Sequence, residues 1–387
     1  MQINTINLRL ALVYMALFAG IGVHLPFFPL WLAAQGLEAS DRAIILAVPM
    51  FIRVFLLSYL IDWGLRAGSV ARAIIIYAVM ASVLTAALPL QPTMALLAIF
   101  SILSSLAWMP ALPLLDALAM GEMRAGRADY GRARLWGSVA FVVLTIAAGA
   151  AIEAFEVWIV IPILCAVLVS IAITAAFLPS DATTRPAEDQ PRALPKLLEH
   201  TRPVRSLFLA AALLQASHAV FYVQGSVHWK QLGYSETVIG ALWMVAIIAE
   251  ILMFLWSRRI VARFDVKSLL MVAGAAAAVR WLVMAFDPPW PVLVSMQILH
   301  ACSFACTHIA TTWLIGRLFS GFLAARAQGL YASLLGAANG VTMLAAGPLY
   351  AHFGGHAQLA MACIAAIALA LTLATRADAA RDTRPAA

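Results

Sequence analysis

A few charged side chains lie inside long apolar runs of this sequence, and Asp116 and Arg134 are the most informative of them. They flank a short charged loop centred near Ala125, nine residues away on either side. If the flanking runs form a helical hairpin, the carboxylate and the guanidinium lie at the same depth on neighbouring helices. Charges at membrane depth are costly, so we expect a functional pair that faces a polar cavity. The alternative is an ion pair that only locks the two helices together.

A second set of ionisable residues follows the same arithmetic. Glu250 and Arg280 are centred on the loop near Asp265, and His300 lies in the next apolar run. An imidazole beside a carboxylate and a guanidinium suits proton transfer, so these three residues are the predicted proton-coupling group. A carboxylate whose protonation differs between two conformations would couple transport to protons. Glu250 is the first candidate for this carboxylate and Asp116 the second.

Arg53 brings the arginines inside the apolar runs to three, against two carboxylates. Arginine stays protonated, so the interior carries an excess of fixed positive charge. A substrate carboxylate would balance this excess, because the guanidinium fork matches a carboxylate with two parallel hydrogen bonds. We therefore expect Arg53 and Arg134 to bind an organic anion while Asp116 orients Arg134. The alternative is that Arg53 or Arg134 bonds to backbone carbonyls or water.

Composition predicts the elements that must position these residues. The chain has 387 residues, of which 64% are hydrophobic and 11% charged, whereas about a quarter of a soluble domain is charged. Runs of about twenty apolar residues are long enough to cross a bilayer as helices. Twelve such runs lie at 8–32, 42–61, 71–89, 93–120, 132–152, 157–178, 204–230, 237–257, 267–287, 291–316, 327–351 and 356–375. The predicted fold is an all-α polytopic membrane protein.

The polar stretch at 179–203 is rich in proline, threonine and charge, and it predicts a cytoplasmic linker between two six-helix bundles at 1–178 and 204–387. Weak repetition between the residues that open runs 132–152 and 327–351 predicts that the bundles are pseudo-symmetric. Most lysines and arginines fall in segments on the side of the N-terminus, and the outer segments hold only Arg42 and Lys230. This asymmetry predicts that both termini are cytoplasmic.

Aromatic side chains could contact an apolar part of the substrate. The candidates are Phe27, Trp31, Tyr222 and Trp229, although Trp31 and Trp229 could equally belong to the aromatic belts at the membrane surface. The sequence has no G-x-x-x-x-G-K-[ST] phosphate loop, so transport should be facilitated or coupled to an ion. We expect no cofactor, no metal site, no enzymatic activity and no nucleic-acid partner.

The stretch D-Y-G-R-A-R-L-W-G-S-V-A-F-V at 129–142 resembles a helix of the phenylpropionate permease family, within the major facilitator superfamily. So do P-L-L-D-A-L-A at 113–119, A-V-R-W at 278–281 and Q-I-L-H-A-C-S-F-A-C-T-H at 297–308. The resemblance covers nearly the whole chain. It implies two related six-helix halves, with a substrate site between them, and uptake of an aromatic acid with protons.

A wider resemblance extends to lactose permease, in which an acid and an arginine at the spacing of Asp116 and Arg134 bind the sugar. Glu250, Arg280 and His300 also match residues of that permease. Two departures matter. Its proton-carrying carboxylate corresponds to Ser303, and a lysine corresponds to Gln297. The loop motif G-x-x-x-D-R-x-G-R keeps only Asp62, which we expect to act in gating by capping a helix end or pairing with a nearby arginine.

The predicted function is proton symport of a small aromatic carboxylic acid such as 3-phenylpropionate. The expected partners are the organic anion, the proton and the lipid bilayer. The protein is expected as a monomer in a bacterial inner membrane. A proton symporter of a sugar or nucleoside is an alternative, because Asp116 and Arg134 could bind hydroxyl groups. Two more hypotheses are an exporter of drugs or metabolites and a membrane receptor that does not transport.

Overall fold

The computed structural model describes residues 5–179, 202–319 and 321–375, and these residues form helices with no strand. The chain divides into two compact units. Unit 1 comprises Met1–Gln190 and Trp229–Ala241, and unit 2 comprises Pro191–His228 and Leu242–Ala387. The predicted bundles at 1–178 and 204–387 stay a prediction, and most of the predicted linker at 179–203 lies outside the described residues.

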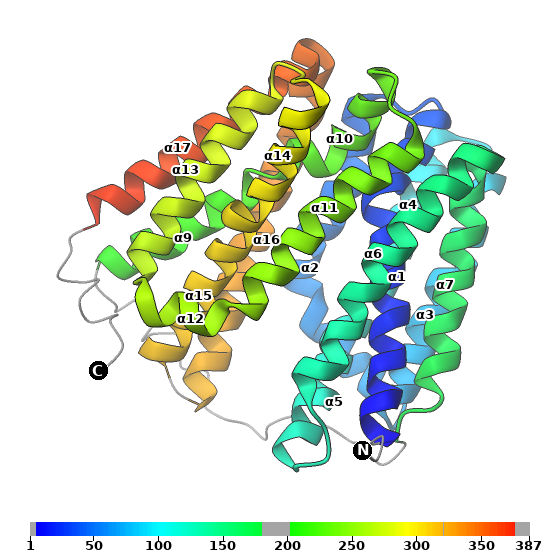
Figure 1. Cartoon of the computed structure of the whole chain (residues 1–387). Helices are drawn as coiled ribbons and strands as arrows, with labels where there is room; N and C mark the ends of the chain where they lie inside the picture. Colours follow the sequence, from blue (N-terminus) through cyan, green and yellow to red (C-terminus); the bar gives the residue numbers. More distant parts are fainter. Residues whose placement is uncertain (1–4, 180–201, 320, 376–387) are drawn as a thin grey trace. The chain divides into compact units, whose positions relative to one another are not determined.

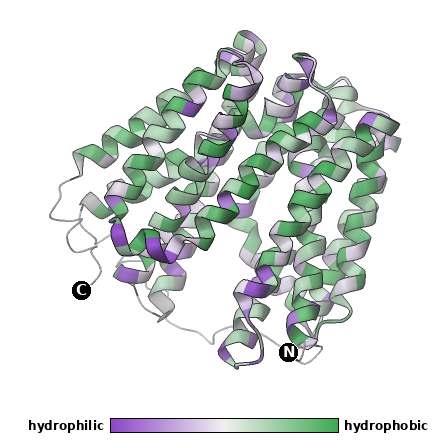
Figure 2. Ribbon diagram, viewed as in Figure 1, coloured by the Kyte–Doolittle hydropathy of each residue, from purple (hydrophilic) through white to green (hydrophobic). Residues whose placement is uncertain are grey.

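The helices before the linker belong to unit 1 (Figure 1). They are α1 (Thr5–Ala34), α2 (Ala39–Leu65), α3 (Val70–Ala86), α4 (Met94–Trp108), α5 (Ala111–Arg124), α6 (Tyr130–Phe155) and α7 (Val160–Ala175). The helices after it are α9 (Arg202–Ala216), α10 (Ala219–Gln231), α11 (Glu236–Leu255), α12 (Ser257–Arg263), α13 (Val266–Met284), α14 (Trp290–His300), α15 (Cys306–Leu318), α16 (Gly321–Phe353) and α17 (Gln358–Ala374). Hydrophobic residues cover most of their length (Figure 2).

Eleven helical segments of the described chain are long and apolar enough to cross a membrane. The last of them, Arg326–Ala374, contains most of α16 and the whole of α17, joined by a short 3-10 turn at Gly354–Ala357. Counting these two helices separately gives the twelve membrane helices that the sequence predicts. The all-α, polytopic fold class is confirmed.

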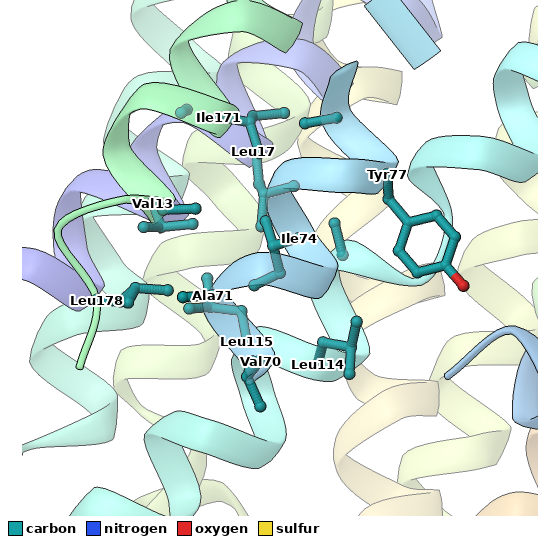
Figure 3. Close-up of a cluster of buried hydrophobic side chains, with 14 of the residues drawn as sticks. Val13, Leu17, Val70, Ala71, Ile74, Tyr77, Leu114, Leu115, Ile171 and Leu178 are labelled. Atoms are coloured by element: carbon teal, nitrogen blue, oxygen red, sulfur yellow. The ribbon is translucent and has the colours of Figure 1, made fainter. Parts of the chain in front are cut away.

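The core of unit 1 forms where α1, α3, α5 and α7 meet. Figure 3 shows Val13 and Leu17 of α1 beside Ile74 of α3 and Ile171 of α7, and all four side chains are buried. In unit 2, α13 packs along α17, and α9 packs against α16 and α17. Lipid cannot solvate unpaired backbone groups, so the helices satisfy their own hydrogen bonds, and side-chain packing then decides which helices associate.

Helices α1 and α6 lie side by side along most of their length because glycines permit a close approach (Figure 1). A Cβ atom at Gly22 would lie 2.7 Å from the carbonyl oxygen of Phe141, and one at Gly137 would lie 2.9 Å from the Phe18 ring. Small residues at helix interfaces allow this approach in membranes. The contact positions the side chains of α1 against those at the start of α6.

Three of the membrane segments are interrupted. Pro110 separates α4 from α5, as expected for a proline, which lacks a backbone donor. Ser217 and His218 separate α9 from α10 without a proline. Between α14 and α15, residues Ala301–Ala305 form a π-helix, a wider turn that often occurs at functional sites.

Candidate functional site

The start of α6 presents the first group of predicted site residues. The Asp129 side chain accepts a hydrogen bond of 3.0 Å from the Arg132 backbone N–H and so caps the helix. The Asp129 backbone N–H in turn donates to the Asn7 side chain at 2.7 Å, which ties this loop to α1. Arg134 therefore lies near the start of a helix whose first turn is held in place against α1.

Asp116 on α5 is held by two tyrosines. The Tyr14 hydroxyl donates a hydrogen bond of 2.6 Å to Asp116 Oδ1, and the Tyr130 hydroxyl donates to the same oxygen at 3.3 Å. Hydrogen bonds to a charged acceptor are among the stronger ones in proteins. The tyrosines come from α1 and α6, so the carboxylate joins three helices of unit 1.

Arg134 stacks on aromatic rings instead of pairing with Asp116. Its guanidinium carbon lies 3.8 Å from the centre of the Phe18 ring and 5.6 Å from that of Tyr14, which is cation–π geometry. Among the described residues, no carboxylate oxygen lies within 4.0 Å of an Arg134 nitrogen. The prediction that Asp116 and Arg134 form a direct pair is wrong for this conformation, because Tyr14 and Tyr130 interact with both charges.

The loop between α5 and α6 carries an ion pair of its own. Arg127 donates two hydrogen bonds, of 2.7 and 2.9 Å, to the two carboxylate oxygens of Glu122. The hydrogen bond and the nearby negative charge raise the pKa of Arg127 above its ordinary value. The loop charges are thus satisfied locally and do not neutralise Arg134.

Arg53 and Asp62 both lie on α2 with exposed side chains. Within the described part of the chain, neither makes an ion pair closer than 4.0 Å. The structure does not bring Arg53 into the group formed by Asp116 and Arg134. Its predicted role in carboxylate binding and the predicted gating role of Asp62 stay predictions.

The four aromatic residues that were predicted to contact the substrate do not all belong to one unit. Phe27 and Trp31 are fully buried on α1. They lie about 14 and 20 Å along the helix axis from Phe18, from the rise of 1.5 Å per residue. The structure therefore does not place them beside Arg134. Trp229 is also buried, with an exposed fraction of 3%, and Tyr222 belongs to unit 2, where it stacks on His218.

Arg280 on α13 organises the site in unit 2. Its side chain is completely buried, and its guanidinium lies 4.2 Å from the Trp281 ring centre and 4.9 Å from that of Phe221. It donates one hydrogen bond of 3.1 Å to Gln297 Oε1 and makes another of 3.1 Å with His300 Nδ1. The predicted neighbourhood of Arg280 and His300 is present in the structure. Gln297, the departure from lactose permease, is a direct partner of Arg280.

The contact with Arg280 determines the tautomer of His300. A guanidinium can only donate, so His300 Nδ1 must accept, and the proton of the neutral ring lies on Nε2. Nε2 is 3.5 Å from Glu250 Oε2, which is longer than a normal hydrogen bond. A second proton on the imidazole would set an N–H group against an N–H group of Arg280. In this arrangement Glu250 is therefore the group that is able to accept a proton.

The ionisable residues of unit 1 and those of unit 2 differ in how exposed their side chains are. Arg280 and His300 are buried, with exposed fractions of 0% and 4%, and Glu250 is half-buried. Asp116 and Arg134 are half-buried and Arg53 is exposed. A solute needs accessible side chains, whereas a proton can pass along hydrogen bonds. The charged residues of unit 1 that are predicted to bind substrate are therefore more exposed than Arg280 and His300, two of the predicted proton-coupling residues of unit 2.

Sequence reasoning missed some residues that the structure brings into these groups. Tyr14 and Phe18 lie in an apolar run with no motif around them, so only their contacts with Asp116 and Arg134 identify them. Tyr130 lies in the stretch 129–142 that carries the family resemblance, but no role was predicted for it. His218 is fully buried beside His300, and the centres of their rings are 5.3 Å apart.

Comparisons with known proteins place these groups in a family context. The model of the MFS_1 like family matches residues 7–361. A probable 3-phenylpropionic acid transporter of Escherichia coli (strain K12) is 28% identical over 368 residues, which are 94% of this chain and 96% of that protein. Maltose permease of Geobacillus stearothermophilus is 28% identical over 212 residues, which are 54% of this chain and 52% of that protein.

A solved structure shares the architecture at lower sequence identity. A mutant form of the nucleoside transporter NupG aligns with a TM-score of 0.83 and 17% identity. The alignment covers 96% of this chain and 98% of that one. At this identity the likeness concerns the fold alone.

Proposed function

The chain belongs to the MFS_1 like family and is a multi-pass bacterial membrane transporter, and from this premise we propose that it is a proton symporter of a small aromatic carboxylate such as 3-phenylpropionate. We also propose that it works as a monomer in the inner membrane with both termini in the cytoplasm. The name of the Escherichia coli relative supports the substrate class, and the distribution of basic residues supports the orientation.

One observation carries the proposal: the cation of unit 1 is half-buried and has no acid within ion-pair distance in the described part of the chain, whereas the cation of unit 2 is fully buried and hydrogen-bonded to His300 and Gln297. Arg134 is half-buried, and one face of its guanidinium rests on Phe18. Stacking uses the face of a guanidinium and not its edge, which carries the N–H groups. Tyr130 interacts with part of this group, and the other N–H groups can bind a carboxylate. Asp116 is held by Tyr14 and Tyr130, so it does not compete for that edge.

In the proposed mechanism, the substrate carboxylate binds Arg134 in unit 1. Tyr14 and Tyr130 keep Asp116 in place, so its charge acts on the guanidinium through these two residues. The Phe18 ring restricts Arg134 to one plane, which lowers the conformational entropy that the side chain loses on binding. The aromatic part of the substrate then contacts the rings around this position.

In unit 2 the proposed event is protonation of Glu250. Before protonation, its charge offsets that of the buried Arg280, with the neutral His300 ring between them. A proton on Glu250 leaves the Arg280 charge without this balance in a buried environment, which is unfavourable. The protonated state therefore favours a rearrangement of the unit 2 helices, and this rearrangement couples the proton to transport.

A second candidate is a proton symporter of a sugar or nucleoside. The name of the maltose permease favours it, and hydroxyl groups could bond to Asp116 and Arg134 as well as a carboxylate could. The half-buried Asp116 carboxylate is the feature that supports it, because a carboxylate accepts hydrogen bonds from hydroxyls and repels an anion.

Uptake of labelled 3-phenylpropionate into proteoliposomes tests the proposal. We expect accumulation when the vesicles have an inward proton gradient and none when a protonophore removes it. Unlabelled aromatic acids should compete, and maltose and uridine should not. Competition by the neutral compounds but not by aromatic acids would replace the proposal with the second candidate. Vesicles without protein are the control.

A further inference from the structure

The break between α9 and α10 lies against the π-helix of Ala301–Ala305, which we name the π segment. His218 Nε2 lies 3.2 Å from the Ser303 hydroxyl oxygen. The Gln215 side chain donates to the Phe304 carbonyl at 3.4 Å. Two side-chain links therefore join the broken helix to the widened one, and both lie within unit 2.

The His218 side chain also bonds to a backbone carbonyl that loses its helical partner at this break. The His218 backbone N–H bonds to Gln215 at 3.2 Å and so does not reach the Leu214 carbonyl, which a regular α-helix would pair with it. The His218 Nδ1 atom lies 3.1 Å from that Leu214 oxygen and 3.2 Å from the Gln215 oxygen. Carbonyls only accept, so Nδ1 carries the proton, and Nε2 of the neutral ring is the acceptor that faces Ser303.

The Ser303 hydroxyl connects His218 to the residue that precedes the π segment. Its oxygen lies 3.2 Å from Nε2 of His218 and 3.2 Å from the backbone oxygen of His300, so its single O–H proton is shared between these two acceptors. Both Ser303 and His218 are fully buried, so water does not compete for these bonds. Unpaired polar groups in such a place are costly, which fixes the geometry of the link.

The position of His300 depends on the π segment because His300 is the last residue of α14. A π-helix inserts an extra residue and so rotates the side chains before it, His300 among them, relative to the side chains after it. A change from π to α geometry would therefore change how the His300 ring faces Arg280 and Glu250. The contact between His218 and Ser303 is one of the two side-chain links that join α9 and α10 to this segment.

We propose that His218 is a positioning residue of the proton-coupling group. Through Ser303 it holds the π segment in place, and it thereby keeps His300 between Arg280 and Glu250. The inference rests on the proposed function for its effect on transport. The structural link itself is tested separately, by a measurement that requires no transport.

The native Cys302 is a reporter inside the π segment. Its side chain is partly exposed, while Cys306 is buried. With Cys165, Cys306 and Cys363 replaced by alanine, the rate of Cys302 alkylation by N-ethylmaleimide in detergent micelles measures how often the segment opens. His218→Gln and His218→Asn are a matched pair. Glutamine places an acceptor near the Nε2 position, and asparagine places its amide only near the Nδ1 position.

We expect His218→Asn to raise the Cys302 alkylation rate about 3- to 10-fold, the effect of losing one buried hydrogen bond. His218→Gln should stay within about twofold of the parent, since a hydrogen bond to Ser303 remains possible. Ser303→Ala should raise the rate like His218→Asn, and the double variant should add nothing further. Equal rates in all variants would overturn the inference, as would equal increases in both His218 variants.

Transport assays on the same variants separate the inference from the proposed function. His218→Asn should reduce proton-driven accumulation more than substrate exchange, and His218→Gln should restore the ratio of the two. If accumulation and exchange fall equally in His218→Asn, the positioning role is wrong. If the parent shows no proton-driven uptake while the alkylation pattern holds, the link stands and the proposed proton coupling fails.

Discussion

The two ionisable groups of this protein use the same residue types in opposite ways. In unit 1, tyrosines hold the Asp116 carboxylate, and the half-buried Arg134 has no acid within ion-pair distance among the described residues. In unit 2, the buried Arg280 binds His300 and Gln297 directly, and His300 leads on to Glu250. Burial and the choice of partner, more than residue type, distinguish Arg134 from Arg280, and the roles that we propose for them rest on this difference.

Replacing Arg134 should give the largest effect on substrate affinity. Loss of a charge-assisted, two-bond contact costs about 1.5–3 kcal/mol, so Arg134→Ala should raise the KM for 3-phenylpropionate about 10- to 100-fold. Arg132→Ala is the matched control, because Arg132 lies two residues earlier with a side chain that is 78% exposed and pairs with Asp129. Equal KM values for the two variants in proteoliposome uptake would remove Arg134 from the binding site.

A change at Arg280 should affect coupling and leave affinity unchanged. Arg280→Lys keeps the charge but not the planar fork that serves His300 and Gln297, so one of these bonds is lost. Proton-driven accumulation should fall about tenfold, from the loss of one buried hydrogen bond to a charged group. The KM for substrate exchange should stay constant. A higher KM with normal accumulation would contradict this assignment, because it would mean that Arg280 in unit 2 contributes to substrate binding.

Removal of one hydroxyl from unit 1 should give the smallest effect. Tyr14→Phe keeps the ring beside Arg134 and removes the 2.6 Å hydrogen bond to Asp116. Loss of about 1 kcal/mol predicts an increase in KM of about fivefold. The exposed Tyr59 gives the control variant Tyr59→Phe, which should not change KM. An unchanged KM in Tyr14→Phe would show that Asp116 does not orient Arg134.

The sequence predicts the fold because the signal is repeated along the chain. Runs of apolar residues long enough for a bilayer recur, and the structure contains the corresponding helices. The break at Ser217 and His218 and the π segment were not predicted, because ordinary apolar and polar residues form both. Their geometry depends on tertiary contacts such as that between His218 and Ser303.

The sequence predicted which charged residues lie inside the helices, but it predicted fewer of the side chains that contact them. Equal distances from a loop centre placed Glu250 and Arg280 at a common depth, and His300 lies between them in the structure. The same arithmetic gives depth but not the direction of a side chain. It therefore paired Asp116 with Arg134 directly, although the aromatic rings from α1 and α6 interact with both.

The measurement that tests the division between the units most directly compares substrate exchange with uphill uptake in Glu250→Gln. Glutamine keeps the size of the side chain and cannot take up a proton. With Glu156→Gln, an exposed glutamate, as the control, the account predicts exchange of labelled 3-phenylpropionate at a normal KM and no accumulation under an inward proton gradient. Accumulation that survives in Glu250→Gln would contradict the account, since the proton would then be taken up elsewhere.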